Sequence, residues 1–210
     1  MKILLIDNLA FAGNLQILLQ EAMPSVELDV VRYDEPIMSI IESGGYDGIV
    51  IGPGPGSPED KAYFGENMRV IREVGTKGTP ILGIGLGCQG IFHAFGGKLK
   101  MLALPMHGKV STLDILEPGV LLRGVKNGAK VMRAHSITAD FDSTPDELMV
   151  TALAVNAGLP NEVNGKEVMA IEHKVHPIYG IQFQPESFGT QFGHWMISNF
   201  LDRCHASAIA

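Results

Sequence analysis

The sequence predicts an open, doubly wound α/β domain: a mostly parallel sheet with helices on both faces and an added antiparallel section. The first half of the chain alternates short apolar runs of β type with stretches that carry apolar residues at helical spacing. The apolar runs are continuous, which is typical of parallel strands buried on both faces. Beyond Gly97 the pattern changes to short strands and turns, through about residue 185, and this indicates the antiparallel section.

The first half divides into four units, each a short strand followed by a helical stretch. The strands are expected at residues 3–6, 26–31, 47–51 and 79–84, and the helices at residues 15–21, 37–41, 58–74 and 88–95. A loop rich in Gly and Pro follows the third strand, and Ser57 is a candidate N-cap for the next helix. Ligands of such sheets bind at the carboxyl ends of the strands, where this loop and a second glycine-rich loop fall.

The C-terminal part of the chain predicts one more helix, from about Gln191 to Leu201. A length of 210 residues suits one domain. We therefore expect a single domain over residues 1–203, with residues 204–210 as a frayed tail.

Composition excludes several classes of protein. The chain is 46% hydrophobic and 19% charged, which excludes a disordered chain, and 16 basic against 23 acidic residues give a net charge of −7. An acidic chain without a basic cluster is expected to bind neither nucleic acid nor an anionic membrane. No apolar run reaches the roughly 18 residues of a spanning helix, and the apolar run at residues 3–6 is too short for a secretory signal. Two cysteines, Cys88 and Cys204, suit a reducing cytosol, so we expect a cytoplasmic protein.

The segment 83–87 (Gly-Ile-Gly-Leu-Gly) follows a buried strand and opens a helix. This context is typical of a nucleophile elbow, in which flanking glycines permit a sharp turn that exposes a Ser or Cys at the helix N-terminus. The middle residue here is Gly85, which has no side chain. The elbow is therefore predicted without its nucleophile.

Two other interpretations of these glycines stay open. Residues 85–90 satisfy G-x-G-x-x-G, the dinucleotide-binding fingerprint, but no Asp or Glu occurs in residues 97–110, where the fingerprint requires a carboxylate. The glycines could also serve only the close packing of a helix on the sheet. Two further features are weak alone: backbone N–H groups of the 54–56 loop could face an oxyanion, and Glu186 could orient a neighbouring base.

Several ordered blocks resemble the class I (triad-type) glutamine amidotransferases, and within them the small subunit of anthranilate or aminodeoxychorismate synthase. The resemblance spans nearly the whole chain. The matching blocks are the G-P-G loop at residues 47–60, the elbow block at 79–89, A-F-G-G at 94–97, M-H-G-K at 106–109, R-A-H-S at 133–136 and the final block at 173–187.

The departures from this family lie in its catalytic triad. The resemblance places the nucleophilic Cys at Gly85, the general base His at Gln184 and the orienting Glu at Glu186. Those enzymes release ammonia from glutamine through a glutamyl thioester, which needs a thiolate and a proton carrier. A glycine cannot attack and a glutamine amide does not titrate near neutrality. Cys88 lies three residues further along the helix and is expected to be a packed thiol rather than a replacement nucleophile.

The resemblance implies a glutamine pocket that is less altered than the triad. The residues it assigns to glutamine binding are Gly54, Pro55, Gly56, Leu86, Gln89 and Ser136. It implies no cofactor. His173, His176 and Glu172 form the one local cluster of metal-ligand types, and their match to the final block favours a strand end over a metal site, so we expect no metal.

The resemblance also implies a partner: a chorismate-binding synthase subunit, with glutamine as a further ligand. We favour a glutaminase-deficient homologue that acts as a non-catalytic or regulatory subunit. An alternative is an ammonia-supplying amidotransferase whose nucleophile and base were substituted, and another is a small-molecule binding module for glutamine or a nucleotide. The loop after the first strand, residues 7–15, is one residue shorter and less polar than in the family, where it lies near the partner-facing side. The partner or its docking mode is therefore expected to differ.

Overall fold

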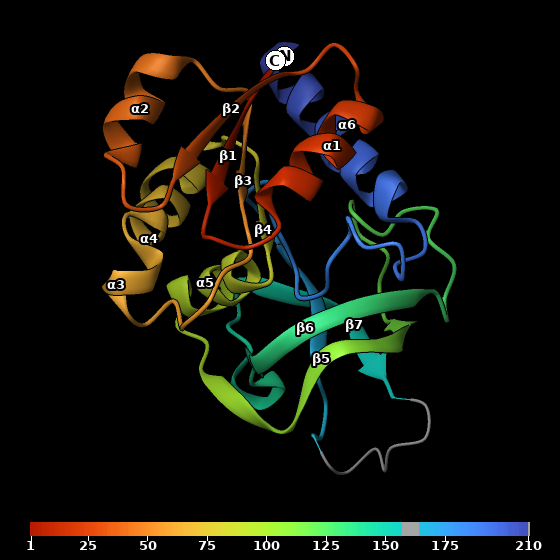
Figure 1. Cartoon of the computed structure of the whole chain (residues 1–210). Coiled ribbons are helices and arrows are strands. Elements are labelled where there is room, and N and C mark those ends of the chain that lie inside the picture. Colours follow the sequence, from red (N-terminus) through yellow and green to blue (C-terminus); the bar gives the residue numbers. More distant parts are fainter. Residues whose placement is uncertain (157–163, 210) are drawn as a thin grey trace.

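The computed structural model describes residues 1–156 and 164–209. The strands are β1 (Lys2–Asp7), β2 (Glu27–Arg32), β3 (Gly48–Ile51), β4 (Ile81–Ile84), β5 (Leu99–Ile115), β6 (Lys130–Ala139), β7 (Leu148–Val155), β8 (Val168–His173) and β9 (Ile178–Ile181). In the described part of the chain they form one nine-stranded sheet, in the order β2-β1-β3-β4-β9-β8-β7-β5-β6 (Figure 1).

The sheet has a parallel half and an antiparallel half. Strands β2, β1, β3, β4 and β9 pair in parallel, and β9, β8, β7, β5 and β6 pair antiparallel. The apolar runs of β1, β3 and β4 are buried on both faces, which explains why they are continuous. The predicted open α/β fold is confirmed, as a large mixed sheet with its antiparallel section at one side.

Helices cover both faces of the parallel half (Figure 1). On one face lie α1 (Ala12–Ala22) and α6 (Gly193–Ile209), and on the other lie α2 (Ile37–Gly44), α3 (Lys61–Phe64), α4 (Asn67–Arg69) and α5 (Leu86–Ala94). Each face has its own buried apolar cluster: Leu15 and Phe200 belong to the first, and Phe64 and Phe92 belong to the second. This is the doubly wound arrangement that the strand–helix alternation predicts.

The prediction of one continuous helix at residues 58–74 is wrong. The chain instead forms α3, α4, a π-helical turn (Val70–Val74) and a 3-10 turn (Gly75–Lys77). The break falls at Gly65, whose φ is +51° and which packs so closely on the carbonyl of Tyr33 that a Cβ atom would lie 2.2 Å from it. The N-cap of α3 is Asp60, which accepts a hydrogen bond from the Ala62 amide at 2.9 Å, and not Ser57.

The last helix is longer than expected. It runs from Gly193 to Ile209, whereas the sequence pattern places its end at Leu201 and a frayed tail from residue 204. Cys204 is fully buried, and its Sγ packs against Gly48 of β3. The boundary at 203/204 is therefore corrected, because packing on the sheet stabilises a further part of the helix. Among the described residues, no helix combines the length and the apolar character that crossing a membrane requires.

Candidate functional site

The elbow lies at the carboxyl end of β4. Gly85 joins β4 to α5 with φ 57° and ψ −108°, its amide donates to the Ile181 carbonyl at 2.8 Å, and its carbonyl accepts from the Gln89 amide at 3.0 Å. Neighbouring glycines are needed for packing: a Cβ atom at Gly87 would lie 2.2 Å from the carbonyl oxygen of Ile51. The sharp strand-to-helix turn of a nucleophile elbow is therefore present, and part of its glycine content serves close helix–sheet contact.

Gln184 faces this elbow from the end of the segment that follows β9. A Cβ atom placed on Gly85 would lie 3.5 Å from Nε2 of Gln184 and 3.1 Å from Cβ of Pro53. The backbone of Gln184 is fixed, because its amide donates to the Met132 carbonyl at 2.9 Å and its carbonyl accepts from Thr190 Oγ1 at 2.6 Å. The two positions that the resemblance assigns to nucleophile and base thus lie side by side.

Glu186 is the third position of the triad. It is partly buried, and burial raises its pKa to about 7. Its Oε2 atom is buried and has no hydrogen-bond partner among the described residues. The side chain borders a cavity of about 690 Å³ that it shares with Gln184. The resemblance implies that this carboxyl would orient an imidazole. Here it is partly desolvated, and its buried Oε2 atom accepts no hydrogen bond from the described residues.

A cavity of about 120 Å³ opens beside Gly85 and Gln184. All six residues expected to bind glutamine line it: Gly54, Pro55, Gly56, Leu86, Gln89 and Ser136. They come from the loop after β3, from the start of α5 and from β6, so the fold brings together three segments that are far apart in sequence. The positions of Gly85 and Gln184 lie in the same wall, while Glu186 lies outside this cavity.

Gln89 is held in one orientation inside the cavity. Its Nε2 donates to the Ile137 carbonyl at 2.8 Å and to Oε1 of Gln182 at 3.2 Å. Both donors of the amide group are therefore used within the protein. Gln182 also lines the cavity, and the sequence analysis did not single it out, although it belongs to the matched final block.

His135 is a second lining residue that the sequence analysis missed. Nε of Arg133 donates to its Nε2 at 3.0 Å, so the ring proton lies on Nδ1, which donates to the Ile137 carbonyl at 2.9 Å. Burial, with the neighbouring guanidinium of Arg133, lowers the pKa of His135 to about 3. His135 is therefore neutral, and both ring nitrogens are occupied, so it is not placed to act as a base. His135 belongs to the R-A-H-S block at residues 133–136, which could have indicated it, but only Ser136 of that block was predicted to bind ligand.

Arg133 itself is fully buried on β6. It forms an ion pair with Glu167, which is also fully buried, and its Nη1 donates to Asn156 Oδ1 at 2.9 Å and to Ser111 Oγ at 3.1 Å. A buried charge needs this kind of complete pairing. The network fixes the ring of His135 through the bond from Arg133 Nε. The Ile137 carbonyl, which accepts from His135, also accepts from Gln89 and so links the network to the cavity.

Cys88 does not reach the candidate site. It is buried on the sheet side of α5, where a Cβ atom at Gly180 would lie 2.8 Å from its Sγ, and burial raises the pKa of its thiol. A thiol that stays protonated is a poor nucleophile. The chemistry that this site offers is hydrogen bonding to a small ligand from amides, a hydroxyl and backbone groups.

The remaining histidine cluster lies in the turn between β8 and β9, at the opposite end of the strands from Gly85. Glu172 accepts hydrogen bonds from the amides of Val120 and Leu121, and Nδ1 of His173 accepts from the amides of Val175 and His176. These atoms are occupied by the backbone. The part of the chain that the structure describes contains no group of three or more His, Cys, Asp or Glu placed to hold a metal ion.

The fold and the site together define an α/β protein with a nucleophile-type elbow and a small ligand cavity at the carboxyl edge of its sheet. Residues 4–204 match the glutamine amidotransferase class-I family. The chain belongs to this family. In fold it is similar to a Thermoplasma acidophilum protein provisionally described as one subunit of a GMP synthase, with a TM-score of 0.82, 23% identity and coverage of 100% of this chain and 96% of the other.

Relatives by sequence carry the names of anthranilate synthase components and of an aminodeoxychorismate synthase. The chain is 42% identical over 208 residues to "Anthranilate synthase component 2" of Leptospira biflexa, covering 96% of this chain and 100% of the relative. It is 35% identical over 203 residues to "Aminodeoxychorismate synthase" of Streptomyces griseus, covering 96% of this chain and 26% of the relative. The resemblance to the small subunits of these synthases is thus confirmed at the level of the family and its named homologues.

Proposed function

We propose that this chain is a glutaminase-deficient class I amidotransferase homologue that acts as a non-catalytic or regulatory subunit of a chorismate-utilising synthase. The observation that carries the proposal is the pair Gly85 and Gln184. At the place where a thiol and an imidazole would meet, the chain has no side chain on one side and a carboxamide on the other. A glutamyl thioester needs both a sulfur nucleophile and a group that moves its proton.

Neither Cys88 nor His135 supplies the missing chemistry, and His107, which also lines the cavity, cannot form a glutamyl thioester without a sulfur nucleophile. Cys88 is packed on the sheet, and His135 is neutral with both nitrogens engaged. The hydroxyl of Ser136 makes no hydrogen bond to a histidine in the described part of the chain. Removing one member of a comparable catalytic unit costs on the order of a million-fold in turnover, and here two are replaced.

The cavity supports a second property, binding of glutamine without hydrolysis. All six expected contact residues line it, and Gln89 is held in place by two hydrogen bonds. A pocket with its polar groups already fixed binds without further ordering cost. Calorimetric titration with glutamine tests this property, with Ser136→Ala as the variant expected to weaken binding and Ser43→Ala, on exposed α2, as its control.

An exposed aromatic face beside the site supports the subunit role. Phe11 is 50% exposed and Phe188 is fully exposed, and both border the 690 Å³ cavity that contains Glu186. Phe11 also has a φ of +57°, an unfavourable conformation for a bulky residue. Large apolar side chains held outward at one cavity mouth are typical of an interaction surface. We place the docking face for the synthase subunit here.

Two measurements test the proposed function. The purified chain, incubated with glutamine alone and with a chorismate-binding synthase subunit from the same genome, is expected to release no ammonia above the background of a heat-inactivated sample. It is expected to co-purify with that subunit. Ammonia release at rates typical of the family would contradict the loss of catalysis, and failure to associate with any such subunit would contradict the partner.

The docking face has its own test. Phe188→Ser is expected to weaken association with the synthase subunit, because it removes the most exposed aromatic side chain at the cavity mouth. Val175→Ser, at the opposite end of the strands and 82% exposed, is the matched control. Equal effects of the two substitutions would show that the aromatic face is not the contact.

A further inference from the structure

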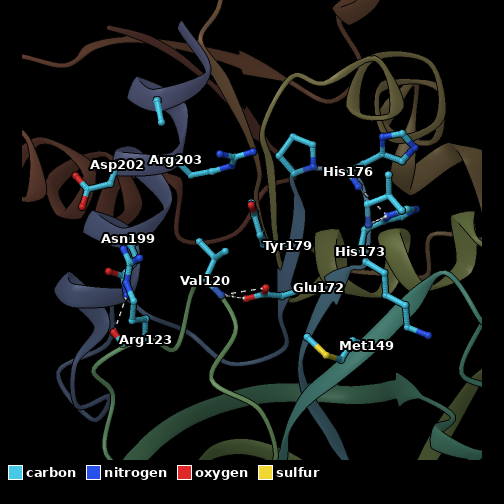
Figure 2. Close-up of a pocket in the computed structure, with 14 residues that line it drawn as sticks. Val120, Arg123, Met149, Glu172, His173, His176, Tyr179, Asn199, Asp202 and Arg203 are labelled. Atoms are coloured by element: carbon cyan, nitrogen blue, oxygen red, sulfur yellow. Dashed lines mark hydrogen bonds between the residues drawn. The ribbon is translucent and has the colours of Figure 1, made fainter. Parts of the chain in front are cut away.

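A third cavity, of about 500 Å³, lies at the opposite end of the strands from Gly85. It is enclosed by α6, by the segment between β5 and β6, and by the turn between β8 and β9 (Figure 2). Tyr179 of β9 and Asn199 of α6 are buried in its wall. It shares no lining residue with the glutamine cavity, so it is a separate feature of the molecule.

Three cationic side chains from three different segments line this cavity. Arg123 comes from the segment after β5, Lys174 from the turn after β8, and Arg203 from α6. No carboxylate oxygen of the described residues lies within 4 Å of their charged nitrogens, whereas Arg69 and Arg133 both have such a partner. The ammonium of Lys174 donates only to the Asp146 carbonyl, at 2.6 Å.

Such a grouping is unusual for this chain. It carries a net charge of −7 and has 16 basic residues in all. Two carboxylates also line the cavity, Asp202 and Glu172. Glu172 is buried, and both of its oxygens already accept backbone amides. The carboxylate of Glu172 is therefore bound to the backbone of the wall. The three cationic side chains that line the cavity outnumber the two carboxylates.

The wall that carries Arg123 is fixed in place from two sides. Glu172 accepts from the Val120 amide at 2.8 Å, and Asn199 Nδ2 donates to the Arg123 carbonyl at 2.9 Å (Figure 2). Glu172 also accepts from the Leu121 amide at 2.9 Å, and Asn199 Nδ2 also donates to the Leu121 carbonyl at 2.9 Å. Both anchoring side chains are buried. The backbone that carries Arg123 is therefore held in place without a ligand, which lowers the ordering cost of binding.

The interior offers polar groups that fit an anion. Figure 2 shows Arg203 reaching from α6 toward the hydroxyl of Tyr179. A planar guanidinium presents several N–H donors that match a carboxylate or a phosphate, and a phenolic hydroxyl adds one more. Cations that line one cavity and have no carboxylate partner among the described residues have an anionic ligand as their complement.

We propose that this cavity is a binding site for a small organic anion, whose carboxylate or phosphate group is held by Arg123, Lys174 and Arg203. The site goes beyond the proposed function, since it shares no residue with the glutamine cavity. The ligand is bound and not transformed. Because the three cations are exposed at the rim, binding weakens as salt concentration rises.

The chain contains its own reporter for this site. Its single tryptophan, Trp195, packs on the segment that carries Arg123: a Cβ atom at Gly124 would lie 3.2 Å from Nε1 of the indole. Titration at constant ionic strength with inorganic phosphate, succinate and uncharged succinamide, followed by tryptophan fluorescence and by calorimetry, distinguishes the two anion classes and separates charge from shape. We expect saturable binding of phosphate or succinate, and none of succinamide.

Variants assign the binding to the cavity. Arg123→Gln and Arg203→Gln are each expected to weaken binding by about tenfold or more, because each removes a charge-assisted contact. Lys126→Gln is the matched control, since it removes a basic charge from the same segment at an exposed position outside the cavity. Absence of saturable binding in both readouts, equal binding of succinamide, or unchanged affinity in both arginine variants would overturn the proposal. These outcomes do not depend on whether the chain hydrolyses or binds glutamine, because the two cavities share no lining residue.

Discussion

Nε2 of Gln184 lies 3.5 Å from the position that a Cβ atom would take on Gly85. Side chains at these two positions therefore lie within reach of each other. The two positions are brought together by the fold, and what the chain lacks there is a sulfur atom and an imidazole.

The double substitution Gly85→Cys with Gln184→His is expected to create glutaminase activity. The elbow places the new thiol beside the new imidazole, and Glu186 gains the donor that it lacks. We expect a gain on the order of a thousandfold over the unmodified chain in an ammonia-release assay.

Each single substitution serves as the control for this pair and is expected to stay inactive, because nucleophile and base act as one unit. A double variant that folds but releases no ammonia would show that the surrounding groups have also diverged. It would then count against the alternative that this chain is an ammonia-supplying amidotransferase in which only the nucleophile and the base were substituted.

Glu167→Gln is expected to destabilise the protein strongly. The substitution leaves the fully buried guanidinium of Arg133 without its counter-charge, which costs about 3 to 5 kcal/mol in the free energy of unfolding. Urea denaturation measures the change. Glu73→Gln, which breaks the exposed pair with Arg69, makes the same chemical change and is expected to have little effect. Similar values for both would contradict the importance of the buried pair.

The contribution of Glu186 to stability is expected to fall as pH rises from about 4.5 to about 7, whereas the lowered pKa of His135 acts in the opposite direction below about pH 6.5. The pKa of Glu186 is raised from 4.5 to about 7 in the folded protein, so the folded state binds the proton more tightly than the unfolded state throughout this window. Glu186→Gln removes this loss. Relative to the unmodified chain, it should gain about 1 to 3 kcal/mol in unfolding free energy between pH 4.5 and pH 8.

The control for this pH dependence is Glu117→Gln, which removes one carboxylate from an exposed position. Urea denaturation at both pH values is expected to show no comparable gain for that variant. If Glu186→Gln changed stability equally at pH 4.5 and pH 8, the carboxyl would not be desolvated as the structure indicates.

Gly119→Ala is expected to destabilise the wall of the 500 Å³ cavity. Gly119 has a φ of +52°, and a Cβ atom there would lie 2.5 Å from the carboxylate of Glu172, so its bonds to Val120 and Leu121 would be displaced. Gly128→Ala has the same kind of backbone strain with nothing within 4 Å. We expect Gly119→Ala to lower the free energy of unfolding by at least about 1 kcal/mol more than this control, measured by urea denaturation.

Local patterns predicted most of the parallel half of the fold. Strands β1, β3 and β4 lie where the continuous apolar runs place them, because a strand buried on both faces is apolar at nearly every position. The same patterns failed between residues 58 and 74 and beyond Leu201. The break at Gly65 depends on the carbonyl of Tyr33, and the extension of α6 depends on Cys204 packing against Gly48. Neither contact is visible in the local sequence.

The candidate site shows the same division. The resemblance to the family, together with the strand–turn–helix context of the elbow, identified the altered positions Gly85 and Gln184 and the six residues that line the cavity. It missed His135 and Gln182, whose place in the cavity depends on the pairing of β6 and β9 with distant parts of the chain. It also could not show that His135 is held neutral by Arg133.

By itself, then, the sequence determined the family, the fold class and the absence of the two reactive groups, since side-chain chemistry is a property of each residue alone. Tertiary structure decided which groups stand close together. It placed Gln184 against Gly85, left Glu186 desolvated without a donor, and gathered three cations around a cavity far from the elbow. Distances and desolvation arise only when remote segments pack, and they set the pKa values and the binding properties that follow.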